Sequence, residues 1–251
     1  MISPSEIATF LECPRRHRYA YVEKPDIPRK VDANLIRGTL GHAALEQFYA
    51  VEATGRSVEL LLTNTELAYS EQLASLSPLH SDEERALWAA FEGAKAAVTT
   101  FWNTFGQDTT HPEALQTEVR LSRNLPSGSE LHGILDAVDD QQSKVVLMEF
   151  KFPAKQPPRK RYTLWSPQHN YYAYLLDTER LVVVEYTVCA AKETRRYQDI
   201  VVRQAVDEAV KIAEEVVVGI ERGQRGARYG FQCERCPYEL LCEARLIGGD
   251  E

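Results

Sequence analysis

The chain has 251 residues, a formal net charge of −8, and 44% hydrophobic and 26% charged residues. This composition is typical of globular proteins, and the length suits one large domain or two small ones. No apolar run approaches the ~18 residues of a membrane span, and Met1–Glu6 turns polar too soon for a signal peptide, so we expect a soluble cytoplasmic protein. The net charge argues against indiscriminate coating of nucleic acid but leaves room for a local basic groove.

The first predicted helix has Ser3 as its N-cap, Pro4 at its first position and Glu6 completing a capping box. It runs towards Cys13, where Pro14 interrupts it.

Two short segments are basic in this acidic chain, one directly after Pro14 among tyrosines and one in a proline-rich stretch after residue 151. Each is either a solvated loop or part of a surface for a polyanionic substrate. The candidate nucleic-acid contacts are Arg15, Arg16, Arg18, Lys155, Arg159, Lys160 and Arg161.

A second predicted helix begins at Arg37, and Gly38 and Gly41 near its start would allow a close approach of another backbone. His42 and Glu46 are four residues apart and share a face of this helix. A lone helical histidine is usually a packed, hydrogen-bonded residue, so His42 by itself does not indicate a ligand.

Residues 57–105 place apolar side chains at spacings of three and four, which is typical of amphipathic helices facing a core. We expect residues 50–110 to be a structural helical insertion. A strand over 113–121, carrying Glu118, follows it.

The most informative stretch is a predicted hairpin of two strands, 131–138 and 144–152. Side chains alternate along a strand, so Glu149 and Lys151 share a face. If the strands pair, Asp136 of the first comes near that face, an arrangement suited to a divalent metal and phosphate chemistry. The alternative is a solvated strand end with a cross-strand ion pair.

The remaining elements alternate between helix and strand. Gln168 and Tyr172 share one face of a helix expected over 163–176. Two strands, 181–189 and 197–202, and an amphipathic helix over 204–222 follow it.

Four of the five cysteines form a metal-ligand pattern, because three lie within ten residues near the C-terminus and Cys13 supplies a fourth. Four thiolates suit zinc or an iron–sulfur cluster. Zinc ligands usually pair two and two, so one distant cysteine joining three favours the cluster. The fifth, Cys189, lies in an apolar strand and reads as a buried free thiol. The proposed ligands are Cys13, Cys233, Cys236 and Cys242.

The sequence resembles the PD-(D/E)xK nuclease superfamily in six motifs that occur in one order. They are Cys13, Gly-Thr-Leu-Gly-His42, Gly-Ile-Leu-Asp136, Glu149-Phe-Lys151, Gln168-x-x-x-Tyr172 and the terminal cysteines. The resemblance is to its RecB-like branch with an iron–sulfur cluster, which includes the AddB nuclease domain and CRISPR-associated exonucleases. It covers nearly the whole chain. No single motif is specific, but six in order are. The Pro-Asp dipeptide is absent, since Leu135 precedes Asp136.

The resemblance implies that His42, Asp136 and Glu149 bind Mn²⁺ or Mg²⁺, assisted by the carbonyl of Phe150. It implies that Lys151 orients or activates the attacking water and that Gln168 and Tyr172 position the lysine, the scissile strand or both.

The implied fold is α/β, a restriction-endonuclease-like core with a central mixed sheet flanked by helices. It is a single nuclease domain over 1–251, with the insertion at 50–110 and a terminal lobe in which 225–246 and Cys13 hold a [4Fe-4S] cluster. The expected activity is exonucleolytic, on single-stranded DNA or DNA ends. No phosphate-binding Gly-x-x-x-x-Gly-Lys loop occurs, so a helicase, CRISPR adaptation or recombination partner would be another chain.

Two other classes remain open from the sequence. One is a non-catalytic subunit that has the same fold and binds DNA ends. The presence of all four expected site residues argues against this class; they are His42, Asp136, Glu149 and Lys151. The other is a zinc-stapled interaction module whose carboxylates are incidental.

Overall fold

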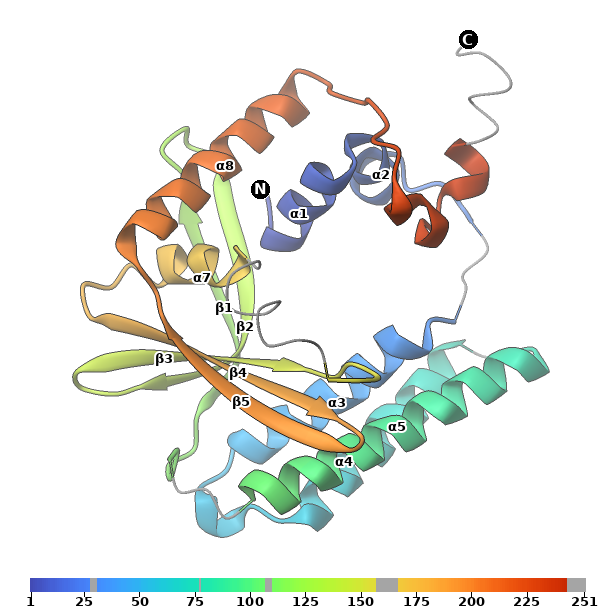
Figure 1. Ribbon diagram of the computed structural model, residues 1–251, viewed down its shortest axis with the longest axis vertical. Coiled ribbons are helices and arrows are strands. Elements are labelled where there is room, and N and C mark those ends of the chain that lie inside the picture. Colours follow the sequence, from blue (N-terminus) through green and yellow to red (C-terminus); the bar gives the residue numbers. More distant parts are fainter. Residues whose placement is uncertain (28–30, 77, 107–109, 157–166, 243–251) are drawn as a thin grey trace.

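Five strands form one mixed sheet between two layers of helices (Figure 1). The computed structural model describes residues 1–27, 31–76, 78–106, 110–156 and 167–242. The strands lie in chain order, and all neighbours are antiparallel except β3 and β4. They are β1 (Gln116–Asn124), β2 (Glu130–Asp140), β3 (Lys144–Lys151), β4 (Leu181–Ala190) and β5 (Glu193–Ile200). The predicted hairpin is therefore confirmed as β2–β3, and the mixed sheet is confirmed with it.

Burial along the strands follows their places in the sheet. The interior strands β3 and β4 are buried on both faces and read as nearly continuous apolar runs, whereas the edge strand β1 alternates between exposed and half-buried residues. The parallel step from β3 to β4 requires a crossover, and α7 (Gln168–Leu176) lies in that connection.

One helical layer consists of α1 (Pro4–Glu12), α7 and α8 (Arg203–Glu221). The apolar stripe of α8 packs with the buried side chains of α7 and of the sheet in a single cluster. The short α2 (Pro14–His17) and a π-helical turn, Arg18–Glu23, extend from α1.

The other layer consists of α3 (Ala33–Tyr49), α4 (Val58–Leu76) and α5 (Ser81–Phe105). Phe48 of α3 and Phe101 of α5 pack with Phe150 of the sheet, so the stretch expected to be an insertion also covers one sheet face. Among the described helices, none is both long and apolar enough to cross a membrane.

The helix starts confirm part of the expected local chemistry. The Ser3 hydroxyl accepts a hydrogen bond from the Glu6 N–H at 3.2 Å, as an N-cap does. The expected capping box is wrong, because the Glu6 carboxylate lies 2.9 Å from the His17 ring instead. The helix expected from Arg37 begins four residues earlier, where the Asp32 carboxylate caps it.

A buried polar network joins β2, β4 and β5 to the segment before β1. The ring of His111, 3% exposed, lies 2.7 Å from Asp139 and 3.4 Å from the fully buried Glu185. Arg196 approaches the same Glu185 oxygen at 3.1 Å, and Gln198 donates to the other at 2.8 Å. The charges in this network are paired, which is the condition under which burial is tolerated.

The network favours a protonated imidazole. Burial lowers the pKa of His111, but the hydrogen bonds to Glu185 and Asp139 outweigh it and leave the pKa raised above the ordinary value of 6.5. A raised folded-state pKa contributes stability that is fully present below the unfolded-state pKa and is lost as pH rises through the folded-state pKa.

We therefore predict that His111→Asn destabilises the fold by about 1–3 kcal/mol at low pH, because it removes a charged partner from two carboxylates. The deficit relative to the wild type should shrink between about pH 5.5 and about pH 8.5, as the wild-type imidazole loses its proton. Urea unfolding at both pH values measures it. A deficit that grows with pH would contradict the assignment.

Candidate active site

The hairpin strands separate at the point where the candidate site lies. β2 and β3 pair from Asp140↔Val145 to Ala137↔Met148, and no register pair follows. Beyond that pair, the Asp136 carboxylate accepts a hydrogen bond from the Phe150 N–H at 2.7 Å. A side chain thus replaces the backbone ladder and holds Asp136 next to the end of β3.

The second helical layer brings His42 to the same point. Its Nδ1 lies 3.3 Å from an Asp136 oxygen. Burial lowers the pKa of His42, but the hydrogen bond and negative charge of Asp136 outweigh it and raise the pKa. A Cβ on Gly41 would lie 2.4 Å from the Phe152 ring, so the glycine permits α3 to approach the end of β3. The same expectation for Gly38 is wrong, because nothing lies within 4 Å of its Cβ position.

Glu149 and Lys151 share a face of β3, as strand alternation predicts, and form an ion pair. Glu149 is 8% exposed. Burial is the main cause of its raised pKa, with Asp136 adding to it and Lys151 opposing it. The Phe150 side chain points to the opposite face, where it stacks on Tyr49 with ring centroids 5.4 Å apart.

The first helical layer contributes Gln168 and Tyr172 from α7. The Gln168 amide donates to the Tyr172 hydroxyl at 2.6 Å. Burial raises the pKa of Tyr172, and the charges of Glu149 and Asp136 raise it further, so this ring lies beside the carboxylates. A Cβ on Gly133 of β2 would meet the Tyr172 ring at 2.8 Å, so this glycine makes room for it.

Two further carboxylates, Glu46 and Glu118, line a cleft of about 540 Å³ together with His42 and Lys151. Glu118 lies across from Asp136 on β1 and has a φ of +49°, a left-handed conformation that is costly for a non-glycine residue. Burial raises its pKa, and Asp136 and Glu46 raise it further. Glu46 shares its helix face with His42, which the sequence shows, but the backbone turn at Glu118 has no sequence signal.

The donor set of one imidazole and several carboxylates suits Mn²⁺ or Mg²⁺. In the described part of the chain, however, no three His, Cys, Asp or Glu side chains are grouped so that they could hold a metal ion. The hydrogen bonds explain this, since an Asp136 oxygen accepts from Phe150 N–H and Glu149 is paired with Lys151. Asp136 and Glu149 therefore face protein donors.

The four predicted cysteine ligands line one cavity of about 180 Å³. Cys13 lies at the break between α1 and α2. Cys233 lies in the short 3-10 helix Phe231–Arg235, Cys236 directly follows it, and Cys242 lies in a helical stretch, 239–242. The Arg228 N–H lies 3.4 Å from Cys13 Sγ, a contact between residues 215 apart in the chain. Cys189 is buried in β4, as expected for a free thiol.

The predicted nucleic-acid contacts differ in their surroundings. Arg15 lines the cysteine cavity, with a guanidinium nitrogen 3.8 Å from Cys242 Sγ. Arg16 and Arg18 are paired with Glu12 and Glu23. Lys155 is exposed. The other predicted contacts, Arg159, Lys160 and Arg161, lie outside the described residues.

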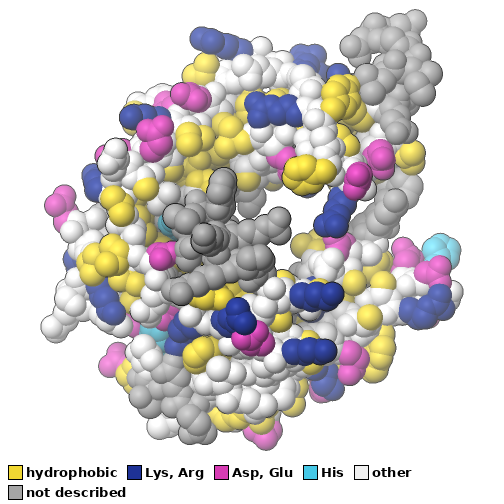
Figure 2. All heavy atoms as spheres, viewed as in Figure 1, with side chains coloured by type: hydrophobic (Ala, Val, Ile, Leu, Met, Phe, Trp, Pro, Cys, Tyr) yellow, Lys and Arg dark blue, Asp and Glu magenta, His cyan; other side chains and the backbone are white. Residues whose placement is uncertain are grey.

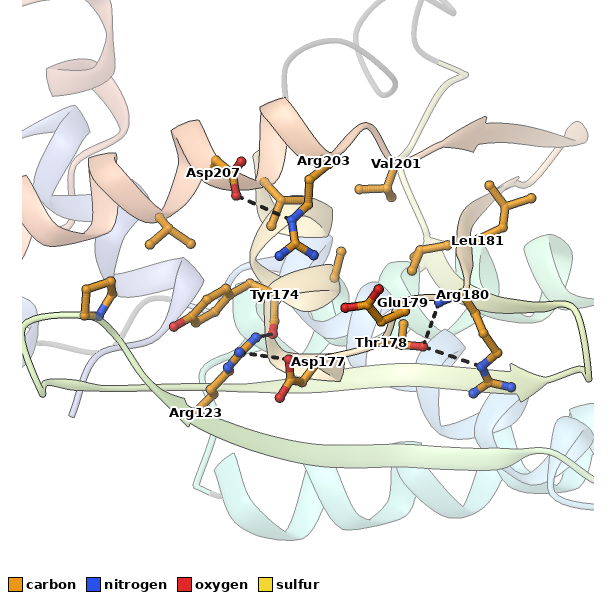
Figure 3. A pocket seen from close by; sticks show the side chains of 15 residues that line it. Arg123, Tyr174, Asp177, Thr178, Glu179, Arg180, Leu181, Val201, Arg203 and Asp207 are labelled. Atoms are coloured by element: carbon orange, nitrogen blue, oxygen red, sulfur yellow. Dashed lines mark hydrogen bonds and ion pairs between the residues drawn. The ribbon is translucent and has the colours of Figure 1, made fainter.

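A larger cavity, of about 900 Å³, lies between α7, α8 and the start of β4 (Figure 3). It contains none of the predicted catalytic residues. Its three arginines are balanced by three acids, and Arg123 is held by Asp177 and by the Tyr174 carbonyl. This balance does not favour a polyanion, so we place the candidate site in the cleft beside His42.

A family model described as the PD-(D/E)XK nuclease superfamily matches residues 1–243. No protein of curated function matches the chain. Among solved structures, a protein from Eubacterium rectale named "Putative exonuclease" has a TM-score of 0.55 and 12% identity, with 94% of this chain and 86% of that chain covered. SSO0001 has a TM-score of 0.47 and 16% identity, covering 97% and 85%.

These structural likenesses are too distant in sequence to show more than the fold, and the second supports no conclusion. The mixed sheet between helical layers agrees with the restriction-endonuclease-like fold. Because the family model spans almost the entire sequence, this chain belongs to the PD-(D/E)XK nuclease superfamily.

Proposed function

We propose that this protein is a metal-dependent deoxyribonuclease that hydrolyses phosphodiester bonds of single-stranded DNA or DNA ends, as an exonuclease. The observation that carries the proposal is the meeting of His42, Asp136, Glu149 and Lys151 where β2 and β3 separate, beside an open cleft. These residues come from one helix and two strands, which is more than a solvated strand end requires.

His42, Asp136 and Glu149 would hold Mn²⁺ or Mg²⁺, with the Phe150 carbonyl as a further oxygen ligand. The bound cation supplies Lewis-acid activation of water and neutralises charge on the phosphate. The imidazole biases the site towards Mn²⁺.

The chain's own groups supply the remaining functions. The Lys151 ammonium, on the cleft wall, orients the attacking water and stabilises negative charge that develops on the phosphate. Gln168 and Tyr172, joined to each other and adjacent to the carboxylates, position this lysine and the scissile strand.

We further propose that Cys13, Cys233, Cys236 and Cys242 bind a structural [4Fe-4S] cluster, which places the protein in the RecB-like branch. The common cavity of these four residues supports it, because it is lined both by Cys13 and by three cysteines from near the other end of the chain. Four thiolates are the usual ligands of such a cluster. A helicase, or a CRISPR adaptation or recombination protein, would act with it as a separate chain.

We predict that Lys151→Ala lowers the rate of DNA cleavage at least about 100-fold while the fold is retained, because it removes the cation nearest the developing charge. The assay is degradation of end-labelled single-stranded DNA with Mn²⁺. The matched control is Lys144→Ala at the other end of the same strand, which should cleave like the wild type.

Chelation of divalent metal should stop wild-type cleavage without unfolding the protein. Wild-type protein that binds DNA but never cuts it, with Mn²⁺ present, would instead favour a non-catalytic end-binding subunit. Equal loss in both lysine variants would show that the effect is general electrostatics rather than catalysis.

We predict that Cys233→Ser, purified without air, loses iron, its brown colour and thermal stability together, because one of four ligands is gone. Iron analysis, the absorption spectrum and the unfolding midpoint measure this. Cys189→Ser, outside the cavity, should keep its iron. Zinc in the wild-type protein, or a metal-free Cys233→Ser protein as stable as the wild type, would refute the structural cluster.

A further inference from the structure

The segment that joins α8 to the cysteine cavity is basic and aromatic. Residues 222–231 read Arg-Gly-Gln-Arg-Gly-Ala-Arg-Tyr-Gly-Phe, with an arginine at every third position from Arg222 to Arg228 and no acidic residue, in a chain of net charge −8. We name this segment, 222–231, the basic arm. Every residue of it except Ala227 is exposed.

The basic arm is held in place at Gly223 and at Arg228. Gly223, with a φ of +68°, ends α8 in a Schellman motif, in which its N–H bonds to Ile220 and the Gln224 N–H bonds to Gly219. At the second point, the Arg228 guanidinium donates to the Leu11 carbonyl. The arm is therefore anchored to α8 and α1, and its middle lies on the surface.

The arginines before Arg228 and the aromatic side chains just after it have few protein partners. Phe231 is 87% exposed and Tyr229 is 63% exposed. Within the part of the chain that the structure describes, Arg222 and Arg225 form no ion pair, unlike Arg16 and Arg18. A large aromatic side chain loses the stabilisation of burial when it stays in water, so two exposed ones beside unpaired arginines indicate a binding surface.

The basic arm lies on the same side of the molecule as α1 and α2 (Figure 1). Across from it lie α3 and the end of β3. Figure 2 shows the molecule hollowed between these parts, with Lys and Arg side chains around the hollow.

We propose that the basic arm binds single-stranded nucleic acid. Arg222 and Arg225 contact phosphates, and Tyr229 and Phe231 stack on unpaired bases. Exposed aromatic side chains interleaved with cations are the features with which proteins bind single strands, since every base has a face to stack and every nucleotide a charge. A duplex offers the charge but not the free base faces. The inference rests on the proposed nuclease function and narrows its substrate to strands with unpaired bases.

The test measures binding without cleavage, by fluorescence anisotropy of labelled oligothymidylate and of a blunt duplex. All variants are made in the Lys151→Ala protein, so that bound DNA is not degraded. Phe231→Ala should weaken single-strand binding roughly tenfold or more and leave duplex binding nearly unchanged. Arg222→Gln with Arg225→Gln should lower the slope of log affinity against log salt by about 0.7 for each arginine.

The matched controls are Leu67→Ala, an exposed apolar residue on α4, and Arg203→Gln, an exposed arginine at the other end of α8. Both should bind as the parent does. Thermal melts check folding, and Phe231→Ala should melt like the parent because its ring is exposed.

Unchanged single-strand affinity in Phe231→Ala would overturn the proposal, and the arm would then be a candidate protein-docking surface. Equal weakening on duplex and single strand would also overturn it, because stacking would not be involved. If the arm variants lose binding and the wild-type protein never cleaves DNA, the proposed nuclease activity is refuted, but single-strand binding by the arm is supported. If the arm variants bind normally and the wild-type protein cleaves DNA, only the proposed binding role of the arm is refuted.

Discussion

The candidate site depends on the point at which the β2–β3 ladder stops. After Ala137↔Met148 the strands diverge, and β2 stays paired with β1 while β3 stays paired with β4. The Asp136 carboxylate takes the place of a carbonyl and accepts the Phe150 N–H. The separated strands expose polar groups to both helical layers, and the chemistry concentrates there.

The same residue types occur in a second cluster with a different outcome. His111, Asp139 and Glu185 resemble His42, Asp136 and Glu149 in composition, but His111 is 3% exposed and has a carboxylate at each ring nitrogen. The His42 side chain is 32% exposed and lines the cleft. Arg196 and Gln198 close the His111 cluster, whereas the His42 cluster borders the cleft. Access to solvent and the number of protein partners, rather than residue type, separate them.

The cysteine cavity has a structural role that goes beyond its ligands. It joins α1, which packs in the sheet's core, to the chain that leaves α8. The Arg228 N–H lies 3.4 Å from Cys13 Sγ there, so the fold brings together residues that are 215 apart in the chain. The basic arm is held at Arg228 by this contact and at Gly223 by the end of α8, so the fold fixes its position.

The sequence by itself determined the hairpin, the shared face of Glu149 and Lys151, the helical stretches and the four cysteines, because these depend on local periodicity and spacing. It also supported the family, through six motifs in order. The left-handed turn at Glu118, the pairing of Glu6 with His17 and the exposure of Phe231 were decided only by the tertiary structure. Each depends on contacts between distant segments, or on their absence, and neighbouring residues do not encode these. For the same reason the sequence does not show that His42 lines a cleft and that His111 is buried. Only the packing of the folded chain distinguishes these two histidines.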